Sequence, residues 1–198
     1  MVDLESRIGI RYAEIIRSMK DKDYLFYAVN YALAPVEKGI KPASVLNFSK
    51  NFKDMYGLWK RYKSDFYKNN MIEFVTININ NDRELVLFYN NKILESTIYD
   101  EKNMEFLKNY GYRKNMSLDE CIMILRRRFD EEFPHEIGVL LGIPVRDVEE
   151  FIKNSGRNYL LSGYWKVYHD VDRALNIFKA YDMAKLDFII QNGTYVHK

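Results

Sequence analysis

Apolar residues in the first third of the chain recur every three or four positions, as they do on one face of an α-helix. Residues 4–19 show this spacing, and residues 24–34 form a second apolar segment that should end before Pro35. A third helical pattern covers residues 52–68. Between them, residues 39–48 are typical of a loop that enters a short strand or helix. This part of the chain is therefore expected to be mainly helical.

The periodicity then changes. Residues 72–79 are rich in β-branched side chains, and residues 84–89 and 92–98 follow as two further strand-like segments. The sequences Asn80-Asn81-Asp82 and Asn90-Asn91 lie between them and favour tight turns. Because sequential strands joined by such short turns pair with their neighbours, the pattern predicts an antiparallel β-meander.

Helical patterns return after the predicted meander. Capping residues, prolines and glycines divide the rest of the chain. The expected helices cover residues 100–111, 117–133, 134–142, 144–156 and 170–190, and a strand is expected at residues 163–168. The predicted fold class is α+β: mainly helical, with a small antiparallel β-meander, one additional late strand, and helices on one face of the sheet.

The length of 198 residues fits a single domain, residues 1–198. No stretch rich in Pro, Gly or Ser marks a linker, and no internal repeat is present. We expect helices over residues 1–70, the β-meander over 71–99, helices plus one strand over 100–190, and a frayed tail over 191–198.

Composition limits the cellular setting. The single cysteine, Cys121, excludes an intramolecular disulfide and a Cys-based zinc cluster. The N-terminus is acidic where a signal peptide would be basic. The longest apolar stretch, residues 137–145, is broken by glycines and a proline and is too short for a membrane helix. These features predict a cytoplasmic protein without a membrane partner.

Charge argues against specific nucleic-acid binding. Thirty basic and 28 acidic residues give a net charge of only +2. Residues 137–152 resemble a helix-turn-helix in their apolar spacing. However, the second of these helices is expected to present two basic and three acidic side chains on its outer face, namely Arg146, Asp147, Glu149, Glu150 and Lys153. A net acidic face does not suit a phosphate backbone.

The pair His135-Glu136 is the first candidate site. Pro134 can begin a helix and place both residues in its first turn, with the imidazole directed toward a cleft. A histidine beside a carboxylate can perform acid–base catalysis, and His135 could also ligate a metal or haem iron. The alternative is a capping or packing histidine beside a surface glutamate.

The segment 163–168 is the second candidate. In a strand, alternation would place Tyr164, Lys166 and Tyr168 on one face. Two phenol rings around an ammonium group suit a planar anion such as a nucleotide, a flavin or a porphyrin with propionates. The alternative is an ordinary core strand with its lysine at the edge.

The loop 39–44 is the third candidate. It contains a glycine, Lys41 and Ser44, which can together bind a phosphate. The spacing of a P-loop is absent, and Pro42 removes one of the backbone amides that such a loop would use. A simple structural turn is the alternative.

The two C-terminal segments carry a resemblance to a known family. With the loop 39–44 and the strand-like segment 85–89, they resemble an uncharacterised bacterial family, the domain of unknown function number 3793, found mostly in anaerobic Firmicutes. The resemblance extends over about residues 25–182. Its specific parts are Pro134-His135-Glu136-Ile137-Gly138, Leu140-Leu141-Gly142, Pro144, Asp147-Val148, Phe151-Ile152 and Gly163-Tyr164-Trp165-Lys166-Val167-Tyr168.

The resemblance implies no established activity. Members are often encoded near flavodoxins and iron-acquisition genes, which implies an iron, haem or redox context. Many members have a cysteine shortly before the Gly-Tyr-Trp-Lys motif, where this chain has Leu161-Ser162, so a thiolate role there is in doubt. The resemblance favours one shared site for the side chains of His135, Glu136, Lys41, Tyr164 and Lys166.

Three functional hypotheses follow. The first is a small-molecule or cofactor-binding protein, such as a haem-, iron- or flavin-linked accessory factor. In it His135 ligates a metal or hydrogen-bonds the ligand, Lys41, Ser44 and Lys166 bind its anionic groups, and Tyr164 and Tyr168 stack on it. The second is an enzyme that uses His135 and Glu136 as an acid–base pair on a small anionic metabolite. The third is an adaptor for a redox partner, such as a flavodoxin-like protein.

Overall fold

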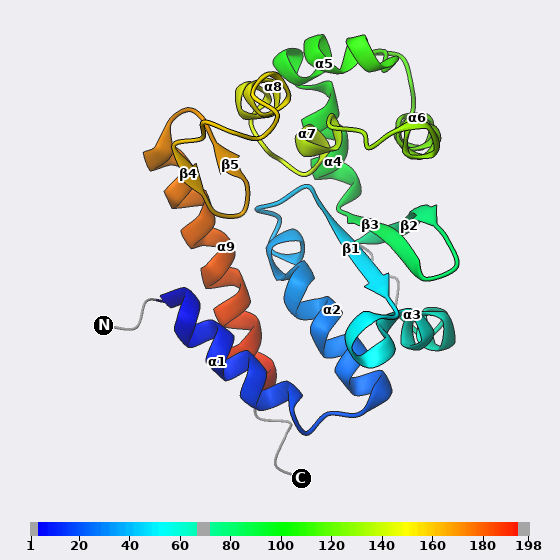
Figure 1. Cartoon of the computed structure of the whole chain (residues 1–198), viewed down its shortest axis with the longest axis vertical. Helices are drawn as coiled ribbons and strands as arrows, with labels where there is room; N and C mark the ends of the chain where they lie inside the picture. Colours follow the sequence, from blue (N-terminus) through cyan, green and yellow to red (C-terminus); the bar gives the residue numbers. More distant parts are fainter. Residues whose placement is uncertain (1–3, 67–71, 194–198) are drawn as a thin grey trace.

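The computed structural model describes residues 4–66 and 72–193 (Figure 1). Its strands are β1 Ala43–Ser49, β2 Glu73–Ile79, β3 Arg83–Tyr89, β4 Leu161–Ser162 and β5 Lys166–Val167. Its helices are α1 Leu4–Ile16, α2 Asp21–Glu37, α3 Asn51–Tyr62, α4 Asn91–Tyr99, α5 Glu101–Leu107 with the 3-10 turn η1 Lys108–Tyr110, α6 Leu118–Glu131, α7 Ile137–Leu140, α8 Val145–Lys153 and α9 Val171–Asn192. The α+β class is confirmed.

Within the described residues, the main sheet is antiparallel in the order β1-β3-β2, with β3 in the centre. Alternate residues of β3 supply two different hydrophobic clusters. Val86 and Phe88 pack with residues of α2 and α3, whereas Leu87 and Tyr89 pack with residues of α4 to α8. Helices therefore cover both faces of the sheet (Figure 1), and the expectation that they cover only one face was wrong.

The third strand of this sheet is not the one that the sequence predicts. Residues 92–98 form most of α4 instead, because the Asn90 side chain accepts a hydrogen bond from the Ile93 amide and starts a helix. Leu94 and Ile98, one helical turn apart, are both fully buried. The third strand is instead β1, most of which lies in the segment 39–48, where the sequence favoured a loop that enters either a short strand or a helix.

Smaller differences concern the ends of elements. α2 does not stop before Pro35 but runs on to Glu37. The predicted helix over 134–142 is reduced to the single turn α7. The late strand becomes the short pair β4–β5, with Ser162 opposite Lys166. The predicted tail mostly lies outside the described residues, and the single-domain assignment stays a prediction.

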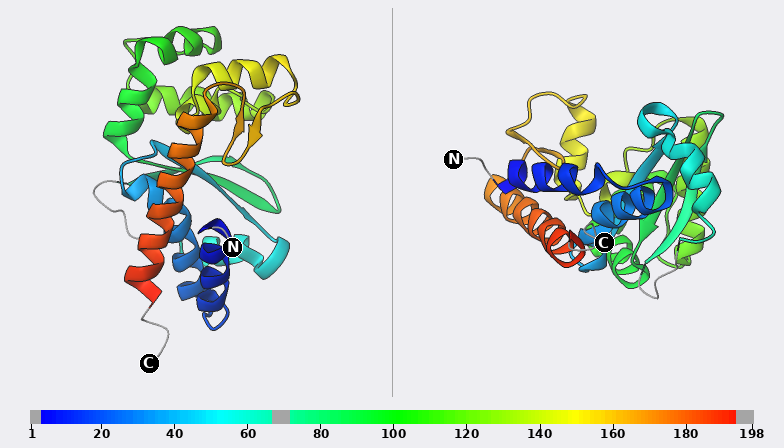
Figure 2. Two further views of the ribbon diagram at one scale, coloured as in Figure 1. Left: turned by 90° about the vertical axis from the view of Figure 1, so that its left-hand side faces the viewer. Right: turned by 90° about the horizontal axis from the view of Figure 1, so that it is seen from below.

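The long helix α9 connects the two ends of the molecule. It packs along α2 and α1 at one end and lies beside the β4–β5 hairpin at the other (Figure 2). There the Trp165 ring packs on the Phe178 ring. None of the helices in the described ranges is long and apolar enough to span a membrane.

Candidate functional site

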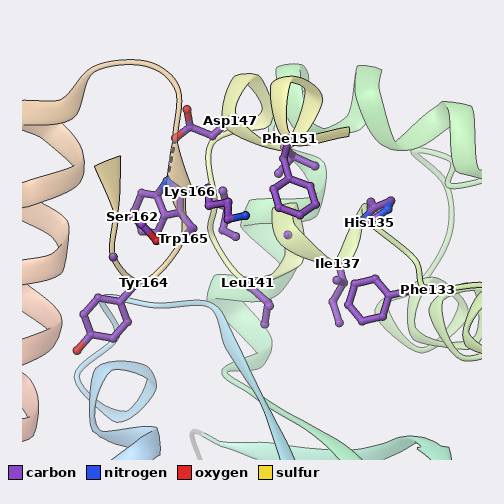
Figure 3. A pocket seen from close by; sticks show the side chains of 14 residues that line it. Phe133, His135, Ile137, Leu141, Asp147, Phe151, Ser162, Tyr164, Trp165 and Lys166 are labelled. Carbon is purple, nitrogen blue, oxygen red and sulfur yellow. Dashed lines mark hydrogen bonds between the residues drawn. The ribbon is translucent and has the colours of Figure 1, made fainter. Parts of the chain in front are cut away.

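A pocket of about 400 Å³ lies between α7, α8 and the β4–β5 hairpin (Figure 3). Its wall is almost entirely apolar and includes Phe133, Ile137, Leu141, Ile143, Val148, Phe151 and Trp165. Five polar side chains also border it, namely His135, Asp147, Ser162, Tyr164 and Lys166. This size and lining are typical of small-molecule sites.

The two helices of the pocket wall approach each other closely at Gly138. A Cβ atom at this position would lie 2.9 Å from the Val148 side chain, so only glycine fits. Pro144 precedes α8, and the backbone amides of Asp147 and Val148 bond to its carbonyl oxygen. These local features fix the orientation of α8 and of its side chain Phe151.

Asp147 anchors the hairpin to α8. Its carboxylate is buried and accepts three hydrogen bonds, from Trp165 Nε1 at 2.8 Å, the Tyr168 amide at 2.9 Å and the His169 amide at 3.0 Å. The expectation that this residue lies on the outer face of its helix was wrong. A buried carboxylate is stable here because charge-assisted hydrogen bonds replace its lost hydration.

Lys166 supplies a cationic group in the pocket wall (Figure 3). Its Nζ donates a hydrogen bond to the Gly156 carbonyl at 2.6 Å and lies 5.7 Å and 5.1 Å from the centroids of the Phe151 and Tyr159 rings. In the described part of the chain no carboxylate forms an ion pair with it. An ammonium group has three donors, so two remain for a ligand.

His135 lies at the opposite rim of the same pocket and is exposed. Its ring centroid is 5.7 Å from that of Phe133 and 5.6 Å from that of Phe151 (Figure 3). The prediction that His135 borders a cleft therefore agrees with the structure, and the ring is not sealed in the core.

Glu136 points elsewhere. It is completely buried, accepts a hydrogen bond from Arg128 Nε and does not line the pocket. Its Oε2 atom has no hydrogen-bond partner among the described residues. The structure thus separates the predicted acid–base pair. Glu136 directly precedes the buried single turn α7 and is buried with it, whereas His135 borders the pocket.

The predicted face of Tyr164, Lys166 and Tyr168 is only partly realised, because the strand β5 is two residues long. Tyr164 borders the pocket, but its hydroxyl donates to Asp182 at 2.6 Å and accepts from Lys185 at 2.9 Å. Tyr168 is buried outside the pocket lining, and burial raises the pKa of its phenol. Stacking of Tyr168 on a ligand is therefore not supported.

The loop 39–44 does not reach the pocket lining. Ser44 is buried in β1 opposite Phe88, and Lys41 lies near the Tyr181 ring of α9. The loop comes close to the site at Gly142, which does not itself line the pocket: a Cβ atom at this position would lie 2.8 Å from Pro42. Two of the three predicted segments meet in one pocket, and the third does not.

A metal site is not built into this pocket. Within the described ranges, no three His, Cys, Asp or Glu side chains come together to hold a metal ion, so His135 belongs to no such group. Cys121 is buried in the core, and burial raises the pKa of its thiol, so it is not an activated nucleophile.

Sequence reasoning missed two residues that shape this site. Asp147 and Phe151 both lie in the motif that carries the family resemblance, but nothing in their local pattern marks a buried anchor or a pocket wall. Their partners, Trp165 and Lys166, follow many residues later in the chain.

The fold and the pocket define an α+β protein with an apolar pocket that is bordered by one lysine, for which the described residues supply no carboxylate partner. The chain belongs to a family described as protein of unknown function (DUF3793), which matches residues 29–195. The match includes every pocket residue named above and omits α1. No curated protein and no solved structure matches the chain.

Proposed function

We propose that this protein binds a small, largely apolar molecule with one anionic group in the pocket between α7, α8 and the β4–β5 hairpin. The observation that carries the proposal is Lys166: its ammonium group borders an apolar pocket of about 400 Å³ and has no carboxylate partner among the described residues. An ammonium group in such surroundings is stabilised by an anion that arrives with the ligand.

The pocket wall indicates the shape of the ligand. Phe133 and Phe151 flank the His135 ring, and Trp165 lines the opposite side, so flat side chains border much of the space. Aromatic rings bind flat apolar molecules by offset or edge-on packing. We therefore expect an aromatic or otherwise planar body, with a carboxylate or phosphate directed at Lys166.

Haem and flavin are candidate ligands of this planar, anionic kind. A haem propionate or an FMN phosphate would pair with Lys166, and His135 offers the exposed imidazole that a haem iron requires. An accessory role in iron or redox metabolism depends on such a cofactor and is part of the proposal, as is the cytoplasmic setting.

The test measures affinity for three anions: hemin, FMN and 1-naphthoate. Titrations use Trp165, which lines the pocket, as a fluorescent reporter, together with calorimetry. The neutral 1-naphthamide matches naphthoate in shape. We expect naphthoate to bind about tenfold more tightly than naphthamide, a difference of about 1.4 kcal/mol, because only the carboxylate pairs with Lys166.

Lys166→Met removes the charge and keeps a long apolar side chain, so it should abolish the preference for naphthoate over naphthamide. Lys153→Met on the exposed side of α8 is the matched control and should change neither affinity. If no probe binds saturably below about 100 µM, or if Lys166→Met keeps the charge preference, the proposal is wrong.

The other two hypotheses are less favoured. The enzyme hypothesis needs His135 and Glu136 as an acid–base pair, but Glu136 is buried and forms an ion pair with Arg128. The adaptor hypothesis is supported by the exposure of Phe133 and Tyr164, which border the pocket, and a flavodoxin-like partner stays a prediction. A small-molecule site accounts for both the cavity and the lysine.

A further inference from the structure

His135 places an imidazole at the rim of the pocket opposite Lys166, and it is exposed there. Its ring packs near the rings of Phe133 and Phe151. Neither imidazole nitrogen forms a hydrogen bond with another described residue. The aromatic neighbours therefore position the ring without using its polar atoms, and these remain for a ligand.

The other polar groups of the pocket lie at the Lys166 end or are already engaged. Ser162 is paired with Lys166 in the β4–β5 hairpin, so the two side chains share a face and belong to the same end. The Tyr164 hydroxyl is held by two residues of α9, and the Asp147 carboxylate already accepts three hydrogen bonds. His135 is therefore the polar group that the pocket offers at its far end.

One aromatic ring connects the two ends of the pocket. The centroid of Phe151 lies 5.7 Å from Lys166 Nζ and 5.6 Å from the centroid of the His135 ring. In Figure 3 the Phe151 ring lies between these two side chains. A flat body that packs on Phe151 would therefore have an ammonium group at one end and an imidazole at the other.

We propose that the pocket selects a planar ligand with a polar group at each end: an anion that pairs with Lys166 and a hydroxyl group that hydrogen-bonds to His135. This inference rests on the proposed function and narrows the ligand class to hydroxyaryl acids. In this arrangement His135 determines specificity. The hydroxyl group can accept a hydrogen bond from one imidazole nitrogen or donate one to the other, so it fits either orientation of the ring.

The test compares 6-hydroxy-2-naphthoate with 6-methyl-2-naphthoate by titration calorimetry of the full-length protein at neutral pH. The two probes share the carboxylate and the two-ring body and differ only in the group at the far end. We expect the hydroxyl compound to bind about fivefold more tightly, the effect of one hydrogen bond. The preference is modest because His135 is exposed, so water binds the imidazole when the methyl compound occupies the pocket.

Three variants assign the preference to one residue. His135→Phe keeps a flat ring beside Phe133 and Phe151 and removes both nitrogens, so the two probes should bind equally. His169→Phe makes the same change at a histidine outside the lining of this pocket and should keep the preference. Lys166→Met should weaken the binding of both probes and leave their ratio unchanged.

The outcomes separate this inference from the proposed function. If neither probe binds saturably below about 100 µM, the proposed function is wrong and the inference falls with it. If naphthoate is preferred to naphthamide but the hydroxyl and methyl probes bind equally, the anion site stands and the second polar end is overturned. A hydroxyl preference that survives in His135→Phe also overturns it. A preference that His135→Phe abolishes and Lys166→Met keeps supports it.

Discussion

At the scale of single residues, Asp147 is the side chain on which the pocket geometry depends most directly. Its Oδ1 accepts from the amides of Tyr168 and His169, and its Oδ2 accepts from the Trp165 indole. One carboxylate thus holds a wall of the pocket to the helix that carries Phe151. Because the group is buried, each lost acceptor leaves a donor without water.

Asp147→Asn should therefore destabilise the protein by about 2–3 kcal/mol. The amide can keep its oxygen toward the two backbone donors, but its NH₂ group then faces the Trp165 N–H. Thermal unfolding should show a Tm lower by roughly 4–12 °C, and naphthoate affinity should fall as the hairpin loosens. Glu149→Gln on the exposed side of α8 is the control; an equal loss in both variants would contradict the anchor role.

The candidate site could be predicted from the sequence only in part at this scale. The sequence predicts that the Pro-His and Gly-Tyr-Trp-Lys segments lie together, and in the structure His135 and Lys166 border one pocket. Glu136 was wrongly grouped with them, because sequence adjacency does not show which of two successive side chains turns toward the core. The bond between Asp147 and Trp165 has no local signal at all.

At the scale of elements, the β4–β5 hairpin depends on close packing against α9. A Cβ atom on Gly163 would lie 2.2 Å from Cε2 of the Phe178 ring, a distance that forces the ring or the hairpin to move. The same ring packs against Trp165 with a centroid distance of 4.5 Å. The hairpin and α9 are therefore fitted to each other through a residue without a side chain.

Gly163→Ala should cost about 1–3 kcal/mol through overpacking and should weaken naphthoate binding. Urea unfolding and the same titration measure both effects. The double variant Gly163→Ala/Phe178→Leu should recover part of the loss, since leucine is smaller. Gly9→Ala in α1, where a Cβ meets nothing within 4 Å, is the control and should stabilise the protein by up to about 1 kcal/mol. A neutral Gly163→Ala would contradict the packing argument.

The elements also show where sequence patterns succeed. α6 begins at the predicted capping box, in which Ser117 accepts from the Glu120 amide and the Glu120 carboxylate accepts from the Ser117 amide. Such a signal is local, so it can be recognised from the sequence. β1 pairs with β3 across about forty residues, and no short-range pattern shows a partner that far away.

At the scale of the whole molecule, shared residues connect its hydrophobic clusters. The central strand β3 contributes to the clusters on both faces of the sheet, and Ile143 packs against both the larger cluster and the one beneath the hairpin. A cluster that shares residues with its neighbour cannot lose its packing alone without exposing them. We therefore expect one cooperative unfolding transition, as the single-domain prediction requires.

The two tryptophans allow a direct test, because Trp59 lies in the cluster of α2, α3 and the sheet, and Trp165 lies in the hairpin and packs in the cluster between the hairpin and α9. In each of the variants Trp59→Phe and Trp165→Phe, one tryptophan remains as a fluorescent reporter. Unfolding in urea is followed by this fluorescence and by far-UV circular dichroism, and the two curves of the same variant are compared. This comparison is insensitive to the stability that Trp165→Phe loses with its bond to Asp147. Coincident midpoints and equal m-values are expected in both variants. A Trp165 signal that changes at lower urea than the helical signal would show that the hairpin region unfolds as a separate unit.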